Sequence, residues 1–165
     1  MKTILLALFL ALAPLGAQDR PVARVDLFVA TDCPIARASS PEIERLHLAY
    51  GGRGVAFRLV FPDRDLEETT VREHLAAFAL TVPFVIDREG DLVRRAKATT
   101  TPEAVLFDPQ GRIVYRGKID NRYSALGKRL AEATEFPLRD AIEAILAGRA
   151  PAVPETVPVG CLIEG

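Results

Sequence analysis

The sequence predicts a single three-layer α/β domain, in which a mixed central sheet is covered by helices on both faces. The chain has 165 residues, 49% of them hydrophobic and 26% charged, which favours one globular domain and excludes intrinsic disorder. Short apolar runs alternate with segments of helical periodicity, as expected of strands joined by right-handed helical crossovers. The last two strands are separated by a tight turn and therefore form an antiparallel hairpin, which makes the sheet mixed.

Residues 1–17 have the composition of a secretory signal peptide. Lys2 is followed by an apolar run over residues 4–12 and then by small residues up to Ala17, the order that is typical of a cleaved export signal. This run is too short to cross a bilayer, which needs about 20 apolar residues. We therefore predict an exported protein, periplasmic or secreted, with no stable membrane span after cleavage.

Five short apolar segments have the length and composition of strands. In chain order, the strands are predicted at residues 22–30, 55–61, 82–86, 103–107 and 112–116. The first segment is almost continuously apolar, which is typical of a strand that is buried on both faces. The last two are separated by Asp108-Pro109-Gln110-Gly111, a turn sequence with proline and glycine in favoured places.

Four segments carry apolar residues at helical spacing. In chain order, helices are predicted over 34–50, from near residue 65 onward, over 88–95 and over 136–146. Gly51 and Gly52 stop the first helix and Gly148 stops the last, because glycine is favoured just beyond a helix C-terminus. The remaining residues, 150–165, are rich in proline and are predicted to form an extended tail.

The charge balance and the absence of several motifs exclude other functions. The chain has 21 Lys and Arg residues against 22 Asp and Glu residues, so no net field attracts polyanions and a nucleic-acid partner is not expected. The sequence has no phosphate-binding loop, no Ser-His-Asp order and no pair of carboxylates suited to hydrolysis. No cofactor is expected.

Three local features stand out around one cysteine and one proline. Cys33 begins the segment Cys33-Pro34-Ile35-Ala36, and Pro41 follows eight residues later inside the first predicted helix. Thr101-Pro102 lies directly before the hairpin, and residues 101–117 run from that proline through both hairpin strands. In order and spacing, these features resemble the thioredoxin-fold superfamily, and particularly its exported redoxin-like members.

The resemblance covers residues 22–148 and implies a thioredoxin-like domain over residues 18–149. The family has a cis-proline beside its active cysteine, so the Thr101-Pro102 bond is expected to be cis and close to Cys33. By the same resemblance, Pro34, Thr101 and Pro102 are expected to face the substrate. Residues 150–165 then form a separate tail.

One position departs from the family. Ala36 stands where a thioredoxin has its second, resolving cysteine, and where a peroxiredoxin has the cysteine that attacks peroxide. Standard dithiol cycling and standard peroxidase chemistry are therefore both unavailable at that position. Any resolving thiol must come from elsewhere in the chain.

Cys33 is the candidate nucleophile. It opens a predicted helix, where backbone N–H groups and the helix dipole stabilise a thiolate, and Arg37 lies one turn further on. Both features lower the pKa of the thiol, whereas the neighbouring carboxylate of Asp32 raises it. The alternative is that Cys33 is a small buried apolar residue or half of an inert disulfide.

Cys161 is the second cysteine of the chain, and it lies in the proline-rich tail. Exported proteins tend to pair their cysteines, so we expect Cys161 to reach Cys33. It would then either replace the missing resolving cysteine or fasten the tail in a structural disulfide. A crosslink that spans 128 residues stabilises a fold by roughly 4 to 5 kcal/mol through lost chain entropy, so the structural alternative carries weight.

These features predict an exported thiol-disulfide oxidoreductase that acts on a protein or small molecule bearing a thiol or disulfide. The alternative is a binding module without catalysis. Such a module would either hold copper through Cys33, Cys161 and a histidine or present Thr101-Pro102 to a partner protein. His47 and His74 lie among apolar residues and are expected to pack or to face solvent. Arg37 stands where copper chaperones of this fold have a second cysteine, so no metal site is predicted.

Overall fold

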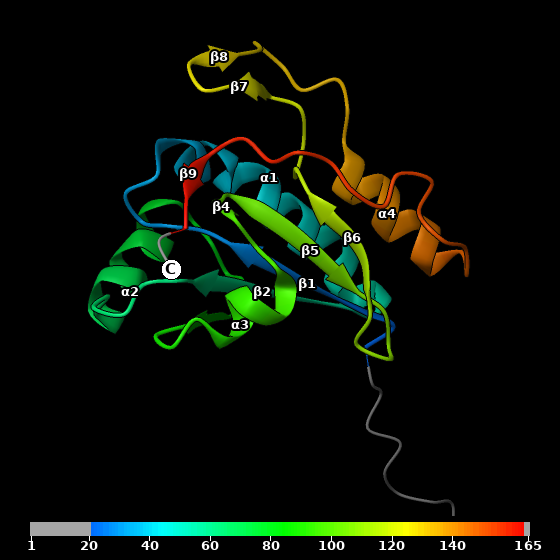
Figure 1. Cartoon of the computed structure of the whole chain (residues 1–165), viewed down its shortest axis with the longest axis horizontal. Coiled ribbons are helices and arrows are strands. Elements are labelled where there is room, and N and C mark those ends of the chain that lie inside the picture. The colour runs from blue at the N-terminus through cyan, green and yellow to red at the C-terminus, as the bar shows by residue number, and fades with distance from the viewer. Residues whose placement is uncertain (1–20, 164–165) are drawn as a thin grey trace, which may run out of the picture.

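The computed structural model describes residues 21–163 of the chain. A central sheet with helices on both faces forms the body of the protein (Figure 1), which confirms the predicted fold class. The predicted signal peptide, residues 1–17, lies outside the described residues. Within residues 21–163, no helix combines the length and the apolar character that a membrane crossing requires.

Five strands form the central sheet, in the order β3-β2-β1-β5-β6. They are β1 (Ala23–Phe28), β2 (Val55–Phe61), β3 (Phe84–Ile86), β5 (Glu103–Phe107) and β6 (Ile113–Gly117). The first three run parallel to one another, and β5 and β6 run antiparallel to their neighbours, so the sheet is mixed as predicted. β1 is the middle strand, and every residue from Val25 to Phe28 is buried.

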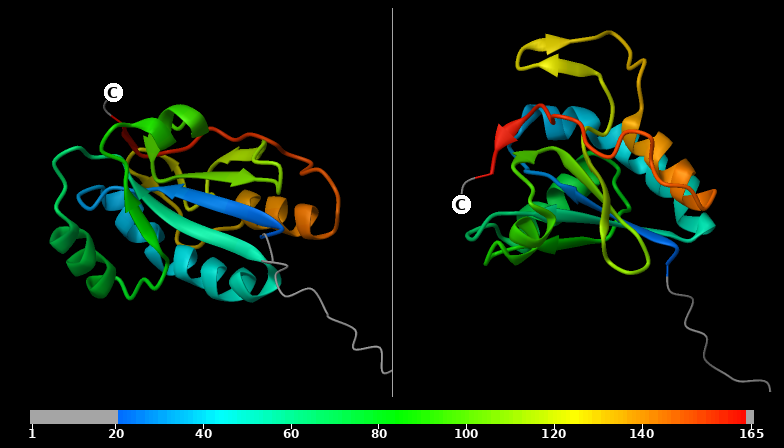
Figure 2. Two further views of the ribbon diagram at one scale, coloured as in Figure 1. Left: turned by 90° about the horizontal axis from the view of Figure 1, so that it is seen from below. Right: turned by 45° about the vertical axis from the view of Figure 1, so that its right-hand side comes forward.

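Helices cover both faces of this sheet. They are α1 (Pro34–Tyr50), the short 3-10 helix η1 (Gly51–Arg53), α2 (Glu68–Ala77), α3 (Asp91–Ala96) and α4 (Pro137–Leu146). Apolar side chains of α1 and α4 pack with Leu27 of β1 in the larger core cluster. Residues of α3 pack with Phe28 on the opposite face in a smaller cluster, and Figure 2 shows α3 on the other side of the sheet from α1 and α4.

Two helices begin later than the sequence predicts, and an aspartate lies ahead of each one. The Asp63 carboxylate accepts the N–H of Asp65 at 2.9 Å, which forms a local turn before α2 begins at Glu68. The Asp87 carboxylate accepts the N–H groups of Leu92 and Val93, each at 2.9 Å. These two amides lie in the first turn of α3, where they have no partner within the helix, so Asp87 stabilises the start of α3 at Asp91.

Four very short strands were not predicted. β4 (Thr100–Thr101) pairs with β9 (Cys161–Leu162), and β7 (Tyr123–Ala125) pairs with β8 (Lys128–Arg129) in a hairpin that projects from the body (Figure 1). Segments of two or three residues are too short to show a hydrophobic period. They are strands only because a partner segment lies opposite them.

The tail returns across the domain instead of ending at α4. It is extended, as predicted, and runs from the end of α4 past β6 to the N-terminal end of α1 (red in Figure 1). It pairs with the edge strand β6 at Arg116, whose N–H donates to the Pro154 carbonyl and whose carbonyl accepts the N–H of Thr156, both at 3.0 Å. The tail therefore reaches the opposite end of the molecule from its point of departure.

Candidate active site

Cys33 is held at the junction between β1 and α1. It is the N-cap residue of α1, and Pro34 occupies the first position of the helix, where its missing N–H is not needed. Cys33 is only 1% exposed. Because β1 and α1 are both buried in the core, they fix the place of the sulfur, as the sequence predicts.

The loop that carries Pro102 lies against this sulfur. The Thr101-Pro102 bond is cis, and the Thr101 carbonyl oxygen lies 3.1 Å from Cys33 Sγ, which confirms the prediction of a cis-proline beside Cys33. The buried carboxylate of Glu103 accepts the N–H groups of Thr99 and Thr100 at 2.7 and 3.2 Å. Glu103 therefore fixes the backbone of the loop just before Thr101.

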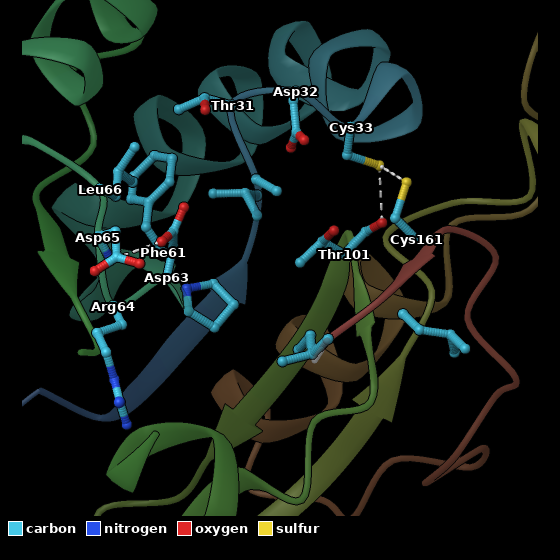
Figure 3. Close-up of a pocket in the computed structure, with 15 residues that line it drawn as sticks. Thr31, Asp32, Cys33, Phe61, Asp63, Arg64, Asp65, Leu66, Thr101 and Cys161 are labelled. Atoms are coloured by element: carbon cyan, nitrogen blue, oxygen red, sulfur yellow. Dashed lines mark hydrogen bonds between the residues drawn. The ribbon is translucent and has the colours of Figure 1, made fainter. Parts of the chain in front are cut away.

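Cys161 meets Cys33 from the opposite side. In the pairing of β4 with β9, Cys161 is the partner of Thr101. The Cys161 thiol donates to Cys33 Sγ with the two sulfurs 2.9 Å apart, and both cysteines are unbonded thiols (Figure 3). The structure thus brings together the two cysteines that the sequence paired, although 128 positions separate them.

The two thiols differ in acidity. Burial raises the pKa of Cys33, but hydrogen bonds from the Cys161 side chain, from the backbone N–H groups of Ala36 and Cys161 and from the Thr101 side chain outweigh it, so the pKa is lowered overall. The hydrogen bond to Cys33 raises the pKa of Cys161 to about 11, and burial and the charges of Cys33 and Asp32 act in the same direction. Cys33 therefore ionises before Cys161.

Asp32 and Arg37, which are expected to shift the pKa of Cys33, act on the pKa values of other groups. Asp32 is exposed and points into a neighbouring pocket (Figure 3), and its charge raises the pKa of Cys161. The guanidinium of Arg37 lies 5.6 Å from the centre of the Phe78 ring. Burial of His74 lowers the pKa of this histidine, and the charge of Arg37 lowers it further. The groups that lower the pKa of Cys33 are hydrogen-bond donors around its sulfur, and Arg37 is not among them.

A pocket of about 670 Å³ opens beside the two sulfurs. Four segments that are distant in the sequence form its walls: the loop before α1, the loop after β2, Thr101 of β4 and the tail from Cys161 to Ile163. Asp32, Asp63 and Asp65 give its rim a negative charge, and Arg64 adds one positive charge (Figure 3). Pro34 is exposed at the start of α1, and Pro102 is buried.

The described residues do not support the expected alternative of a copper site. Over residues 21–163, no group of three or more His, Cys, Asp or Glu side chains is arranged to hold a metal ion. His74 packs edge-on against Phe61 and beside Phe78, and His47 packs edge-on against Phe57. Both histidines pack against aromatic rings, as predicted.

Sequence reasoning missed two residues that shape this site. Glu103 is a charged residue at the start of an otherwise apolar strand segment, and that contrast is a usable signal for a buried structural carboxylate. Gly160 precedes Cys161, and a Cβ atom at this position would lie 2.0 Å from the Thr101 carbonyl oxygen. A glycine next to the tail cysteine hinted at a close backbone contact, but the contacting residue follows only from the tertiary structure.

Comparisons with known proteins agree with this fold. A family model described as Redoxin matches residues 19–130, and no curated protein sequence matches the chain. An uncharacterised conserved protein from Geobacillus kaustophilus is similar in structure, with a TM-score of 0.73 and 24% identity over 87% of this chain and 77% of that one. A hypothetical protein from Sinorhizobium meliloti has a TM-score of 0.72 and 25% identity over 88% and 80% of the two chains.

Another protein of similar structure, at lower identity, has a described activity. A secreted disulfide oxidoreductase from Mycobacterium tuberculosis, homologous to Escherichia coli DsbE, has a TM-score of 0.50 and 15% identity over 76% of this chain and 81% of that one. At this identity the likeness shows a thioredoxin-like fold. The Redoxin match ends at residue 130, so it includes Cys33 and Thr101-Pro102 but not Cys161.

Proposed function

Because the chain belongs to the Redoxin family, we propose that it is an exported thiol-disulfide oxidoreductase with Cys33 as the nucleophile and Cys161 as the resolving cysteine. The observation that carries the proposal is the distance of 2.9 Å between the two sulfurs. A thiol at this distance can take the part of the resolving cysteine that Ala36 replaces. The family itself supports a thioredoxin-like redox function.

The first step is attack by the Cys33 thiolate on a substrate disulfide. A bond forms between Cys33 Sγ and one substrate sulfur, and the other substrate sulfur leaves with the bonding electrons and takes a proton from water. The donors around Cys33 favour this step, because they lower its pKa and raise the fraction of thiolate at neutral pH.

The second step resolves the mixed disulfide. Cys161 loses its proton to water and attacks Cys33 Sγ, so that a bond between the two protein sulfurs replaces the bond to the substrate. The second substrate sulfur leaves as a thiolate and is protonated. In total, one substrate disulfide is reduced to two thiols while Cys33 and Cys161 are oxidised to a disulfide, and an external thiol must reduce that disulfide before the next cycle.

The proposal includes the organisation of the chain and its location. Residues 1–17 are the cleaved signal, residues 18–149 are the redox domain, and residues 150–165 are the tail that supplies Cys161. Export agrees with the secreted state of the Mycobacterium tuberculosis oxidoreductase that shares the fold. An oxidising compartment would also allow the Cys33–Cys161 disulfide to persist. Pro34, Thr101 and Pro102 would border the substrate, a protein or small molecule with a thiol or disulfide.

Oxidised glutathione and intact mass under non-reducing conditions test the proposal. Reduced wild-type protein should release both glutathione halves and end two hydrogens lighter, with Cys33 bonded to Cys161. Cys161→Ser should stop at a single glutathione adduct on Cys33. Cys33→Ser should form a glutathione adduct much more slowly than Cys161→Ser does, if it forms one at all. With an added thiol reductant, turnover should be lost in Cys33→Ser and slowed in Cys161→Ser, in which only the external thiol can resolve the Cys33 adduct.

Two results would contradict the assignment. Turnover by Cys161→Ser at the wild-type rate would exclude Cys161 as the resolving cysteine. The disulfide would be purely structural if two results were found together for Cys161→Ser. The variant would be less thermally stable than oxidised wild type but not less stable than reduced wild type, and it would release its Cys33 adduct as fast as wild type does.

A further inference from the structure

The proposed nucleophile is covered in the closed structure. Cys33 is 1% exposed, and Cys161, which lies directly over it, belongs to the exposed strand β9. A substrate disulfide must bring one of its sulfurs into contact with Cys33 Sγ before any bond can form. The tail occupies the side of Cys33 from which Cys161 donates its hydrogen bond (Figure 3).

The end of the tail pairs with β4 through backbone hydrogen bonds. Thr101 pairs with Cys161 and Thr100 with Leu162, and the N–H of Ile163 donates to the Thr99 carbonyl at 2.9 Å. Gly160 allows this approach, since any Cβ there would collide with the Thr101 carbonyl. We call residues 160–163 the latch. Among its side chains, Leu162 is 80% exposed, whereas Ile163 is half-buried against the smaller core cluster.

The tail has a second and stronger attachment upstream. The Thr156 hydroxyl accepts the N–H of Lys118 at 2.8 Å and shares a hydrogen bond of 2.8 Å with the buried Tyr115 hydroxyl. A Cβ at Gly117 would lie 2.2 Å from the Thr156 carbonyl, so the backbones are in direct contact here too. Val157, the next residue, is 81% exposed. We call the attachment at Thr156 the hinge.

We propose that the tail is a strap, hinged at Thr156 and latched at residues 160–163, and that Cys33 meets its substrate only when the latch opens. This inference rests on the proposed function, in which Cys33 attacks from the site that the strap covers. The hinge keeps Cys161 near when the latch is open, since five residues of extended chain span at most about 17 Å. Cys161 then returns from a high effective concentration to attack the mixed disulfide.

The consequence is that one motion serves both steps. Release of the latch exposes Cys33 and withdraws Cys161, so the nucleophile is free of its resolving partner while the substrate binds. Closure brings Cys161 back to Cys33 Sγ, and the new disulfide fastens the latch by a covalent bond. An external thiol that reduces this bond frees the latch again.

The test measures the alkylation of Cys33 by iodoacetamide, and all variants carry Cys161→Ser so that one thiol is present. The reference is Cys161→Ser alone, whose β9 backbone is intact. Adding Gly160→Ala, which places a Cβ against the Thr101 carbonyl, should raise the rate at least tenfold. The matched control is Gly52→Ala, since a Cβ there meets nothing within 4 Å, and it should leave the rate unchanged. Rates are compared at pH values above the Cys33 titration, so that differences in ionisation do not enter.

Equal rates with and without Gly160→Ala would overturn the strap. So would a reference rate as fast as that of the protein unfolded in urea, because Cys33 would then not be covered. Neither readout involves a substrate or a resolving thiol, so this test can fail while the glutathione experiment succeeds, and the reverse also holds.

A second measurement does not depend on Gly160→Ala folding correctly. Alkylation of Cys33 in the Cys161→Ser protein is followed in increasing but non-denaturing urea. If the latch opens locally, the rate should depend only weakly on urea, because little surface is exposed. A dependence as steep as that of global unfolding would contradict the strap.

Discussion

The two sulfurs of the site are held in very different ways. Cys33 stands between the middle strand of the sheet and a 17-residue helix, and its position is set by a buried core. Cys161 stands on a two-residue strand whose residues are both exposed, and its position is set by a few backbone hydrogen bonds. The comparison shows one cysteine held by the core of the fold and a second cysteine held on a short strand of the tail.

This difference separates stability from chemistry. A change in the elements behind Cys33 removes buried apolar contacts and weakens the whole fold. A change at an exposed tail residue such as Leu162 removes little buried surface, so its effect should appear in the reactivity of the thiols.

The largest expected effect is on the stability of the core. Leu27 in β1 is 0% exposed, and Leu27→Ala should lower the free energy of unfolding by about 2–5 kcal/mol through the lost apolar burial and the cavity. Leu162→Ala in the tail should change it by less than about 0.5 kcal/mol, as exposed substitutions do. Urea unfolding measures both. Similar losses in the two variants would mean that the tail is part of the cooperative core.

Glu103 joins the two regions and should give an intermediate effect. Glu103→Ala leaves the N–H groups of Thr99 and Thr100 without their acceptor. Thr100 is buried, and an unpaired buried donor costs about 1–3 kcal/mol. Because β9 pairs with this loop, the variant should also speed the alkylation of Cys33. Glu103→Gln keeps an acceptor oxygen and should lose less stability by urea unfolding. Equal losses in the Ala and Gln variants would show that charge, not the acceptor, matters.

The smallest effect concerns acidity at the contact between the regions. Burial raises the pKa of Cys33, and the hydrogen bond from Cys161 is the largest influence that lowers it. Cys161→Ser replaces a thiol donor that lies 2.9 Å from Cys33 Sγ by a shorter hydroxyl. The pH profile of Cys33 alkylation should therefore move to higher pH than in the reduced wild-type protein. A profile that stays in place would assign the lowered pKa to the backbone donors alone.

Local sequence patterns predicted much of the fold. The bounds of α1, β2 and β5 coincide with the predicted ranges, because each is a long periodic or continuous apolar segment with a clear stop signal. α2 and α3 start later than predicted: Asp63 forms a local turn before α2, and Asp87 binds the amides of the first turn of α3. The hydrophobic period does not report such side-chain contacts. The strands β4, β7, β8 and β9 could not be predicted, because segments of two or three residues are too short to show a hydrophobic period.

The sequence by itself determined one half of the candidate site and tertiary structure decided the other. Cys33 at a helix start and Thr101-Pro102 before a hairpin follow from local order, since the elements that hold them are encoded by neighbouring residues. That Cys161 lies 2.9 Å from Cys33, opposite Thr101, was decided by the path of the tail. Pairing between segments far apart in the chain depends on backbone contacts, here at Gly117 and Gly160, and such contacts leave no repeat in the sequence.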